Sequence, residues 1–365
     1  MAKSFLTCLL VAGIATTAFA EKSVSETSRG GESNVGDLIF QEEFDGFNHD
    51  LWKYEINMNG GGNGEFQIYD KTGNNSYVRD GILYIRPTLT VYEKFGGNYE
   101  QLFNGDISLD GCTDEGGMDG PGCRRHGQYP KILPPVTSAR LRTKGTFSFR
   151  YGRVEVRAKM PSANWVWPAI WMLPEGWKYG GWPASGEIDI VESRGNRDLN
   201  KNGQNIGSEL VGSTLHFGPK WPYNGQWAAH GEKNTPSGQG FDRDFHMYGV
   251  EWTKTQIKFT VDGEVIKTIT PPGGGFFELG RFPSTEKNVW EGADNFLMAP
   301  FDQPFHFILN VAVGGMYFPS DSSPAPPWGQ ENPWADFMAS KDQWYNTWKE
   351  EDAAMQVDYI RVYAV

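Results

Sequence analysis

Short strand-like stretches recur along this chain. The clearest is 154–160, where valine, alanine and methionine alternate with glutamate, arginine and lysine. A period of two gives a β-strand one buried and one solvated face. Further strand-like stretches, separated by turn residues, occur at 81–85, 257–265, 305–313 and 355–363. The pattern predicts an all-β fold in which two antiparallel sheets pack as a sandwich.

The strand pattern continues from residue 37 to residue 365, and we expect a single domain there. A chain of 365 residues is long enough to bury a large core. Residues 21–36 are polar and rich in glycine and serine, which predicts a flexible lead-in. A segment from about 90 to 135 interrupts the pattern and is interpreted as an insert. Helical periodicity is scarce and predicts one short helix near 343–350.

Residues 1–20 have the features of a secretory signal peptide. Lys3 precedes an apolar run at 9–14, and Ala18-Phe19-Ala20 offers a small-x-small cleavage site. The apolar run is too short to span a bilayer. We therefore expect a secreted, extracellular protein whose mature chain begins at Glu21.

The cysteines fit this interpretation. Cys8 would leave with the signal peptide, and Cys112 and Cys123 would remain in an oxidising compartment. A disulfide between them is the expected outcome. Closing so short a loop would contribute about 3 kcal/mol of stability in the chain-entropy model.

Charge and aromatic content limit the partners of this chain. The net charge of −12 argues against nucleic acid or an anionic membrane, because both require basic patches. A neutral ligand is compatible with it. The chain has 14 tryptophans, and a run of them falls between 165 and 182. Their aromatic faces are surfaces on which sugar rings stack.

One strand-like stretch sets three acids among branched apolar residues. Glu187 and Asp189 have the same parity, so on a strand they share a face. Glu192 has the opposite parity. It joins the other two only if one extra residue near Ile190 and Val191 is accommodated as a β-bulge, a device common beside active sites. The bulge would line all three carboxylates on one surface.

Two acids with a third between them form the arrangement that cleaves a glycosidic bond with retention. One carboxylate attacks the sugar, the other protonates the leaving oxygen, and the middle one can hold a proton. Two other interpretations remain open, namely a solvated strand face and a site for calcium or magnesium. The neighbouring tryptophans favour the sugar-cleaving interpretation.

Other chemistries find little support. Residues 191–195 resemble a Gly-x-Ser-x-Gly nucleophile elbow, but valine occupies the first glycine position. Zinc-binding spacings of His and Cys are absent from the sequence. The run Gly60 to Gly64 lacks the lysine of a phosphate loop and indicates a turn. No cofactor is therefore required.

The stretch Glu187-Ile188-Asp189-Ile190-Val191-Glu192 resembles the bulged Glu-x-Asp-x-x-Glu signature of glycoside hydrolase family 16, in its laminarinase-like branch. Similarity to the family extends over roughly 37–365. Its other motifs lie at 62–67, 138–144, 151–155, 167–174, 310–315 and 357–362. The resemblance implies a jelly-roll sandwich of two curved antiparallel sheets with a substrate groove on the concave face.

The insert at 90–135 and residues 332–334 look like the animal members of the family. Those members include digestive β-1,3-glucanases and glucan-recognition proteins of invertebrate immunity. The resemblance implies a secreted, monomeric endo-β-1,3-glucanase that acts on laminarin-like polysaccharides with retention, with transglycosylation as a side reaction. The alternative is a β-1,3-glucan-binding protein of innate immunity. Such proteins characteristically lack one or both catalytic glutamates, and this chain has both.

Carried over position by position, the resemblance assigns the three acids distinct roles. Glu187 matches the nucleophile, Asp189 the assisting acid and Glu192 the general acid/base. Trp167 and Trp171 match the tryptophans beside the cleavage point, although core packing is an alternative for Trp167.

Five further positions are assigned roles. Asn63 and Arg140 match residues that hydrogen-bond sugar hydroxyls, with a structural role as the alternative for each. His216 resembles a cleft histidine, and a core histidine is the alternative. Trp290 is interpreted as a loop residue that closes a distal subsite. Asp358 matches a position that helps to bind a structural calcium in some members, and a salt bridge at the strand end is the alternative.

Overall fold

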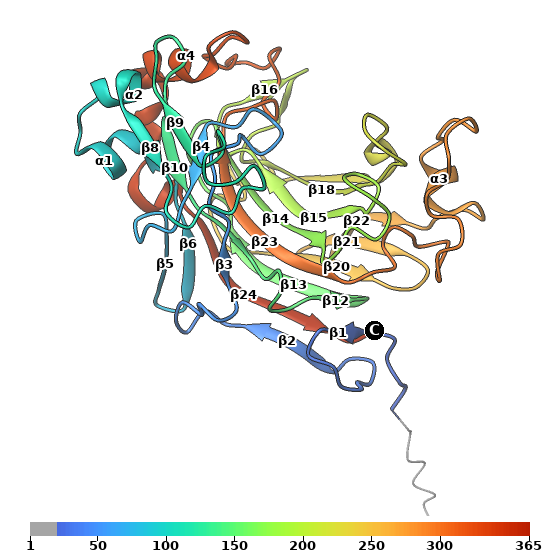
Figure 1. Cartoon of the computed structure of the whole chain (residues 1–365). Coiled ribbons are helices and arrows are strands. Elements are labelled where there is room, and N and C mark those ends of the chain that lie inside the picture. The colour runs from blue at the N-terminus through green and yellow to red at the C-terminus, as the bar shows by residue number, and fades with distance from the viewer. Residues whose placement is uncertain (1–19) are drawn as a thin grey trace, which may run out of the picture.

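The computed structural model describes residues 20–365. The expected signal peptide at 1–20 therefore lies outside the described residues, apart from Ala20. Two large antiparallel sheets are stacked as a curved sandwich, and short helices gather at its ends (Figure 1). The predicted all-β fold is confirmed as a jelly roll.

The first sheet has nine strands and positions the candidate site. In order it contains β1 (Glu26–Thr27), β12 (Phe149–Arg150), β23 (Phe305–Val313), β14 (Val166–Pro174), β15 (Glu187–Ser193), β18 (Leu210–His216) and β19 (His230–Asn234), while β11 (Arg140–Arg142) pairs with β23 and with β3 (Lys53–Tyr54). Strands β14 and β15 pair antiparallel, with β18 on the other side of β15.

The second sheet has eight strands and backs the first. It contains β22 (Glu264–Ile269), β21 (Ile257–Val261), β20 (His246–Trp252), β13 (Gly152–Lys159), β24 (Met355–Tyr363), β6 (Ile82–Ile85) and β5 (Ser76–Arg79), with β2 (Leu38–Glu42) on β24. Residues of β13 alternate strictly between buried and half-buried, as its sequence predicts. The remaining strands are β4 (Gln67–Tyr69), β10 (Val136–Ser138) and β7 (Thr88–Leu89), the pair β8 (Asp106–Ser108) and β9 (Arg124–His126), and the pair β16 (Asn200–Lys201) and β17 (Gln204–Asn205).

The core between the sheets is rich in aromatic rings. Phe40 of β2 stacks on Phe147 at 4.0 Å between ring centroids, and Phe307 of β23 lies 6.0 Å from Phe40. Trp252 of β20 packs edge-on against Phe149. Burying each such ring stabilises the fold by about 1.5–3 kcal/mol, so contacts across the two sheets hold the sandwich together.

The helices are short. They are α1 (Thr90–Phe95), α2 (Glu100–Asn104), α3 (Gly275–Leu279), α4 (Pro333–Ala339) and α5 (Lys341–Trp344), with the 3₁₀ turns η1 (Gln226–Ala228), η2 (Tyr345–Thr347) and η3 (Glu350–Ala353). The helix expected near 343–350 is divided among α5, η2 and η3. Among residues 20–365, none of the helices combines the length and the apolar character needed to cross a bilayer.

The insert at 90–135 is tied to the domain. It contains α1, α2, β8 and β9, and its Leu102 and Ile107 are buried in the common core. The predicted disulfide between Cys112 and Cys123 is present and closes a loop of the insert. Arg125 lies over the ring of Trp334 at 4.9 Å, which joins the insert to α4.

The flexible lead-in expected at 21–36 is wrong, because this segment is hydrogen-bonded to the domain. Strand β1 pairs with β12, and the N–H of Val24 donates to the carbonyl of Val365 at 2.9 Å. Ser23 Oγ donates to the same carbonyl. The polar composition of the segment gave no sign of these backbone bonds, because their partners lie far away in the sequence.

Candidate active site

The β-bulge expected in β15 is present. On β14, Ile170 pairs with Val191 and Trp171 pairs with Asp189, so Ile190 is the extra residue. The register of β15 against β18 shifts at the same place, between Asp189 and Glu192. The bulge corrects the parity of Glu192, as the sequence predicted.

The three acids lie together on the outer face of the nine-stranded sheet. Ile188 points into the core between the sheets, so Glu187 and Asp189 point away from it. Nε2 of His216, on the neighbouring strand, lies 3.6 Å from Glu187 Oε1 and 3.1 Å from Asp189 Oδ2. The charge of Glu192 acts on both other carboxyls. Three acids and one histidine therefore form a single electrostatic cluster.

An indole N–H orients each glutamate. Trp182 Nε1 donates to Glu187 Oε2 at 3.1 Å, and Trp167 Nε1 donates to Glu192 Oε1 at 2.9 Å. The ring of Trp167 is fixed in turn, because it stacks on Tyr317 with centroids 4.2 Å apart. The two glutamates are thus held by separate tryptophans.

Burial and mutual repulsion favour protonation within the cluster. Burial raises the pKa of Glu187 to about 8, and the charge of Asp189 adds to the rise. Burial and the charge of Glu192 raise the pKa of Asp189 well above its usual range. A proton held by Asp189 removes one cause of the high pKa of Glu187. Glu187 therefore ionises more readily when Asp189 is protonated than when Asp189 is charged.

His216 presents a proton to the acids. Its Nδ1 accepts a hydrogen bond from Asn224 Nδ2 at 2.8 Å, so the ring proton lies on Nε2, which faces Glu187 and Asp189. The contact with Asp189 Oδ2 is short, but that oxygen accepts no well-aligned hydrogen bond. Donor atoms of these two acids and His216 lie within 4.8 Å of one another, the spacing of a cation site. The proton on Nε2 fits proton sharing better than metal ligation.

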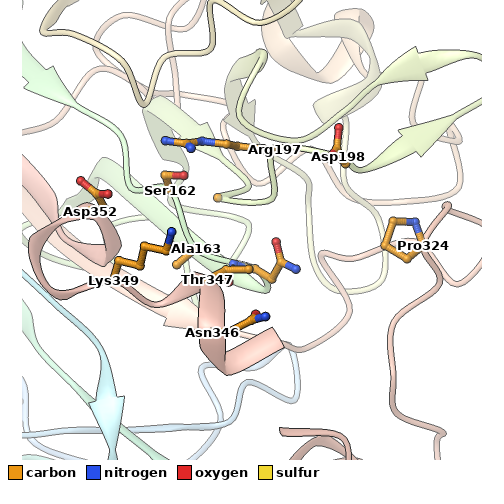
Figure 2. A pocket seen from close by; sticks show the side chains of 11 residues that line it. Ser162, Ala163, Arg197, Asp198, Pro324, Asn346, Thr347, Lys349 and Asp352 are labelled. Atoms are coloured by element: carbon orange, nitrogen blue, oxygen red, sulfur yellow. The ribbon is translucent and has the colours of Figure 1, made fainter. Parts of the chain in front are cut away.

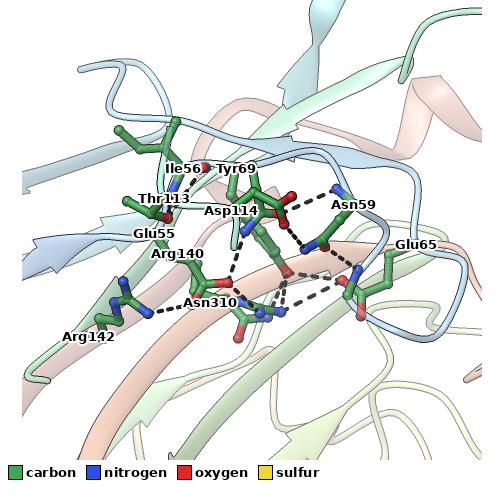
Figure 3. Close-up of polar contacts among 12 residues, drawn as sticks. Glu55, Ile56, Asn59, Glu65, Tyr69, Thr113, Asp114, Arg140, Arg142 and Asn310 are labelled. Atoms are coloured by element: carbon green, nitrogen blue, oxygen red, sulfur yellow. Dashed lines mark hydrogen bonds and ion pairs between the residues drawn. The ribbon is translucent and has the colours of Figure 1, made fainter. Parts of the chain in front are cut away.

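Arg140 belongs to a network of polar side chains that includes Glu55 and Tyr69 (Figure 3). Trp171 joins this network through Asn310. Trp171 Nε1 donates to Asn310 Oδ1 at 2.7 Å, and Asn310 Nδ2 donates to the hydroxyl of Tyr69 at 3.1 Å. Arg140 donates to Glu55 Oε1 at 3.1 Å, and its guanidinium lies 4.4 Å from the ring centroid of Tyr69. Arg140 is therefore largely engaged within the protein.

Half-buried Glu55 and buried Glu65 flank Arg140, and their pKa values are shifted in opposite directions. Burial opposes the charge on Glu55, but Arg140 and Arg142 hold its pKa below the ordinary value. Burial raises the pKa of Glu65 in spite of Arg140. Two arginines therefore favour the charge on Glu55, whereas burial opposes the charge on Glu65.

In the described part of the chain, no hydrogen bond or ion pair joins Asn63 or Asp358 to the three acids. Asn63 Nδ2 lies 3.5 Å from Glu65 Oε1, and its carbonyl accepts the N–H of Met316 at 2.9 Å. Asp358 forms an ion pair with Arg157, which is the alternative that the sequence left open for it.

The subsite expected at Trp290 is wrong. This side chain is only 1% exposed, and its indole N–H donates to the carbonyl of Ala184 at 2.8 Å. It packs among Phe217, Phe277 and Phe282. A buried indole with a satisfied N–H is a core residue.

Sequence reasoning missed four residues of the site, namely Tyr69, Trp182, Asn310 and Tyr317. Asn310 had a usable signal, because it and His306 are the two polar residues of the otherwise apolar strand β23. Trp182 lay in the tryptophan run but had no distinguishing mark. Tyr317 follows the Gly-Gly pair and gave no periodic signal.

A cavity of about 420 Å³ lies elsewhere, beside the connection from β13 to β14 (Figure 2). Its lining includes Asn164, Arg197, Lys349 and Asp352. None of the three clustered acids lines it. We therefore place the candidate active site on the open face of the sheet and not in this cavity.

The fold and the row of acids define a class, the jelly-roll glycoside hydrolases and their relatives. The model of the glycosyl hydrolases family 16 matches residues 125–294, which include all three acids. The chain belongs to this family.

Relatives with different described roles support the assignment. The β-1,3-glucan-binding protein of Penaeus monodon is 46% identical over 340 residues, covering 89% of this chain and 90% of that protein. The glucan endo-1,3-β-glucosidase of Cryptopygus antarcticus is 34% identical over 298 residues, covering 80% and 87%. The laminarinase from Rhodothermus marinus superposes with a TM-score of 0.55 at 29% identity, covering 90% and 97%.

Proposed function

We propose that this protein is an endo-β-1,3-glucanase that hydrolyses laminarin-like glucans with retention of configuration. The observation that carries the proposal is the cluster of Glu187, Asp189 and Glu192 on one face, with a separate indole N–H on each glutamate. A protein that only binds glucan needs no such pair of oriented carboxyls. The named activities of the glucosidase and laminarinase relatives agree with this substrate.

In the first step, an oxygen of Glu187 attacks the anomeric carbon of the bound glucosyl unit. Glu192 gives its proton to the glycosidic oxygen, the C–O bond breaks, and the leaving chain departs with a free hydroxyl. Because Trp167 occupies Oε1 of Glu192, the proton is transferred from Oε2. Trp167 also stabilises the negative charge that Glu192 gains.

In the second step, Glu192 acts as a base. It removes a proton from water, the water oxygen attacks the anomeric carbon, and the bond to Glu187 breaks. Two inversions give net retention. A hydroxyl of a second glucan chain can replace water, and the product is then a transglycosylated glucan. The chemistry uses protons and carboxylates alone, so the proposal includes no cofactor.

A second function, binding without hydrolysis, is favoured by one observation. The Penaeus monodon relative, at 46% identity over most of both chains, is described as a β-1,3-glucan-binding protein. Under this alternative the face of β14, β15 and β18 would hold glucan without cleaving it.

Laminarin distinguishes the two functions. The wild-type protein is incubated with laminarin, reducing ends are counted, and the anomeric configuration of the first products is followed by NMR. We expect hydrolysis with β-configured products, and loss of nearly all activity in Glu187→Gln and Glu192→Gln. Wild-type protein that binds laminarin without releasing reducing ends would overturn the enzyme proposal and support the binding function.

We also propose that the protein is secreted and acts as a monomer. The disulfide between Cys112 and Cys123 is consistent with an oxidising compartment. Expression of the full chain in a secreting host, with N-terminal sequencing of the medium fraction, tests export and the expected start at Glu21. Light scattering of the purified protein tests the monomer.

A further inference from the structure

A largely exposed tryptophan stands beside the acid cluster. Trp221 is 67% exposed, and it follows β18 in a loop. Its ring centroid lies 5.6 Å from that of Trp182, the residue that donates to Glu187. Trp182 in turn lies 5.7 Å from the ring of His216. Aromatic rings therefore lead from the cluster outward to Trp221.

The loop that carries Trp221 is tied at several points. Lys220 pairs with Glu286 at 2.8 Å, and the N–H of Tyr223 donates to the carbonyl of Lys220. The N–H of Gly225 donates to the carbonyl of Phe217 at 2.7 Å. These contacts fix the chain on both sides of Trp221.

Gly218 lets the same loop close tightly. A Cβ at this position would lie 2.0 Å from the carbonyl oxygen of Tyr223, so any other residue would force the two backbones apart. Asn224, near the end of the loop, bonds to His216. The loop is thus coupled to the cluster itself.

An indole held largely in water forgoes the burial that would stabilise it. The side of β15 on which Trp221 lies can also be stated. Strand β18 lies on one side of β15, whereas β14, β23 and the Arg140 network lie on the other. Trp221 and Trp182 therefore extend the face on the β18 side, opposite Arg140.

We propose that Trp221 and Trp182 form a stacking subsite for a glucosyl unit of the β-glucan chain, on the β18 side of the bond that is cleaved. The apolar face of a pyranose ring covers the exposed indole, and the occupied subsite favours longer chains. The inference rests on the proposed function for its substrate, but it concerns binding and is separable from catalysis.

Trp227 provides a matched control. It is 56% exposed and follows Trp221 closely in the chain, but its ring contacts Arg281, whose guanidinium lies 5.1 Å from the ring centroid. Replacing it removes the same type of side chain from the same region without touching Trp182.

The test compares Trp221→Ala, Trp221→Phe and Trp227→Ala. Values of kcat/KM are measured on laminarin oligosaccharides of increasing length. We expect the loss in Trp221→Ala to grow with chain length and to reach about three- to tenfold, the size of one aromatic stacking contact. Trp221→Phe should recover most of it because it retains a flat ring. Thermal unfolding confirms that each variant is folded.

Binding is measured separately in the Glu187→Gln background by calorimetry with laminarin oligosaccharides. A weaker affinity on adding Trp221→Ala, but not Trp227→Ala, supports the subsite even if the wild-type protein hydrolyses nothing. Equal effects of the two alanine variants, or an affinity that Trp221→Ala leaves intact, would overturn the subsite while the hydrolytic proposal stands on its own test.

Discussion

Trp167 donates its indole N–H to Oε1 of Glu192 at 2.9 Å while its ring lies flat on Tyr317. The guanidinium of Arg194 lies 3.9 Å from the ring centroid of Tyr317 on that stack. Arg194 is itself bound to the carbonyl of Tyr317. The orientation of the proposed acid therefore depends on a stack of three side chains, of which only Trp167 contacts the carboxyl.

The variant Trp167→Phe should separate orientation from stacking. Phenylalanine keeps a ring on Tyr317 but has no N–H for Glu192. Because a hydrogen bond to a charged group contributes about 1.5–3 kcal/mol, we expect kcat to fall about 10- to 100-fold. The hydrogen bond strengthens as Glu192 becomes charged, so KM should change little.

Steady-state kinetics on laminarin measure this effect. The exposed Trp177 provides the control, since Trp177→Phe makes the same change away from the stack. A rise in KM without a fall in kcat would show that Trp167 acts on the substrate and not on Glu192.

The pH profile of kcat/KM should move in opposite directions in two variants. Burial raises the pKa of Glu187 to about 8, the charge of Asp189 adds to the rise, and the N–H of Trp182 lowers it. Attack requires ionised Glu187, so the ascending limb follows its ionisation. Trp182→Phe should therefore move this limb to higher pH, and Asp189→Asn should move it to lower pH.

Profiles of the two variants and the wild-type protein are measured from pH 4 to pH 9 with one laminarin oligosaccharide. Limbs that move in the same direction, or that stay fixed in both variants, would show that Glu187 is not the group that titrates.

Removing the buried charge of Glu187 should stabilise the fold at high pH. Its pKa in the folded protein is about 8 against an ordinary value of 4.5, so folding favours the protonated form. The stability that protonated Glu187 contributes is fully present below about pH 4.5 and is lost as the pH rises through about 8. The side chain of Gln in Glu187→Gln cannot ionise, so this variant does not lose stability in this way.

At pH 8, we expect the free energy of unfolding of Glu187→Gln to be larger than that of the wild-type protein by on the order of 1–4 kcal/mol. One pKa unit corresponds to about 1.4 kcal/mol. The difference should shrink toward pH 4. Urea unfolding at both pH values measures it. A difference of the same size at both would assign it to packing and not to charge.

The sequence predicted what depends on local periodicity and parity. Alternation identified β13 and β23, and the parity of Glu192 required the bulge that β15 contains. Both inferences depend only on neighbours along one strand. These two inferences therefore require no knowledge of the tertiary fold.

Features that depend on distant partners were missed or misjudged. Trp290 is in an irregular segment, where the sequence has no periodicity that could indicate burial. Its N–H donates to the carbonyl of Ala184, which is far away in the sequence. Residues 21–36 are polar but donate to the backbone of Val365. The hydrogen bond from Trp182 to Glu187 depends on the path of the intervening loop, which composition does not determine.

The disulfide of the insert gives a final prediction, on stability. Cys112 and Cys123 are 11 residues apart, and a loop of that size should contribute about 3 kcal/mol through the entropy of the unfolded chain. The loop lies against the core, because the N–H of Met58 donates to the carbonyl of Gly122 at 2.8 Å. The double variant Cys112→Ser/Cys123→Ser should thus unfold at a lower urea concentration and yet keep activity on laminarin, since neither cysteine contacts the three acids. Reductant should lower the midpoint of the wild-type protein by a similar amount and leave that of the variant in place. A variant that loses activity while still folded would show that the insert shapes the active face.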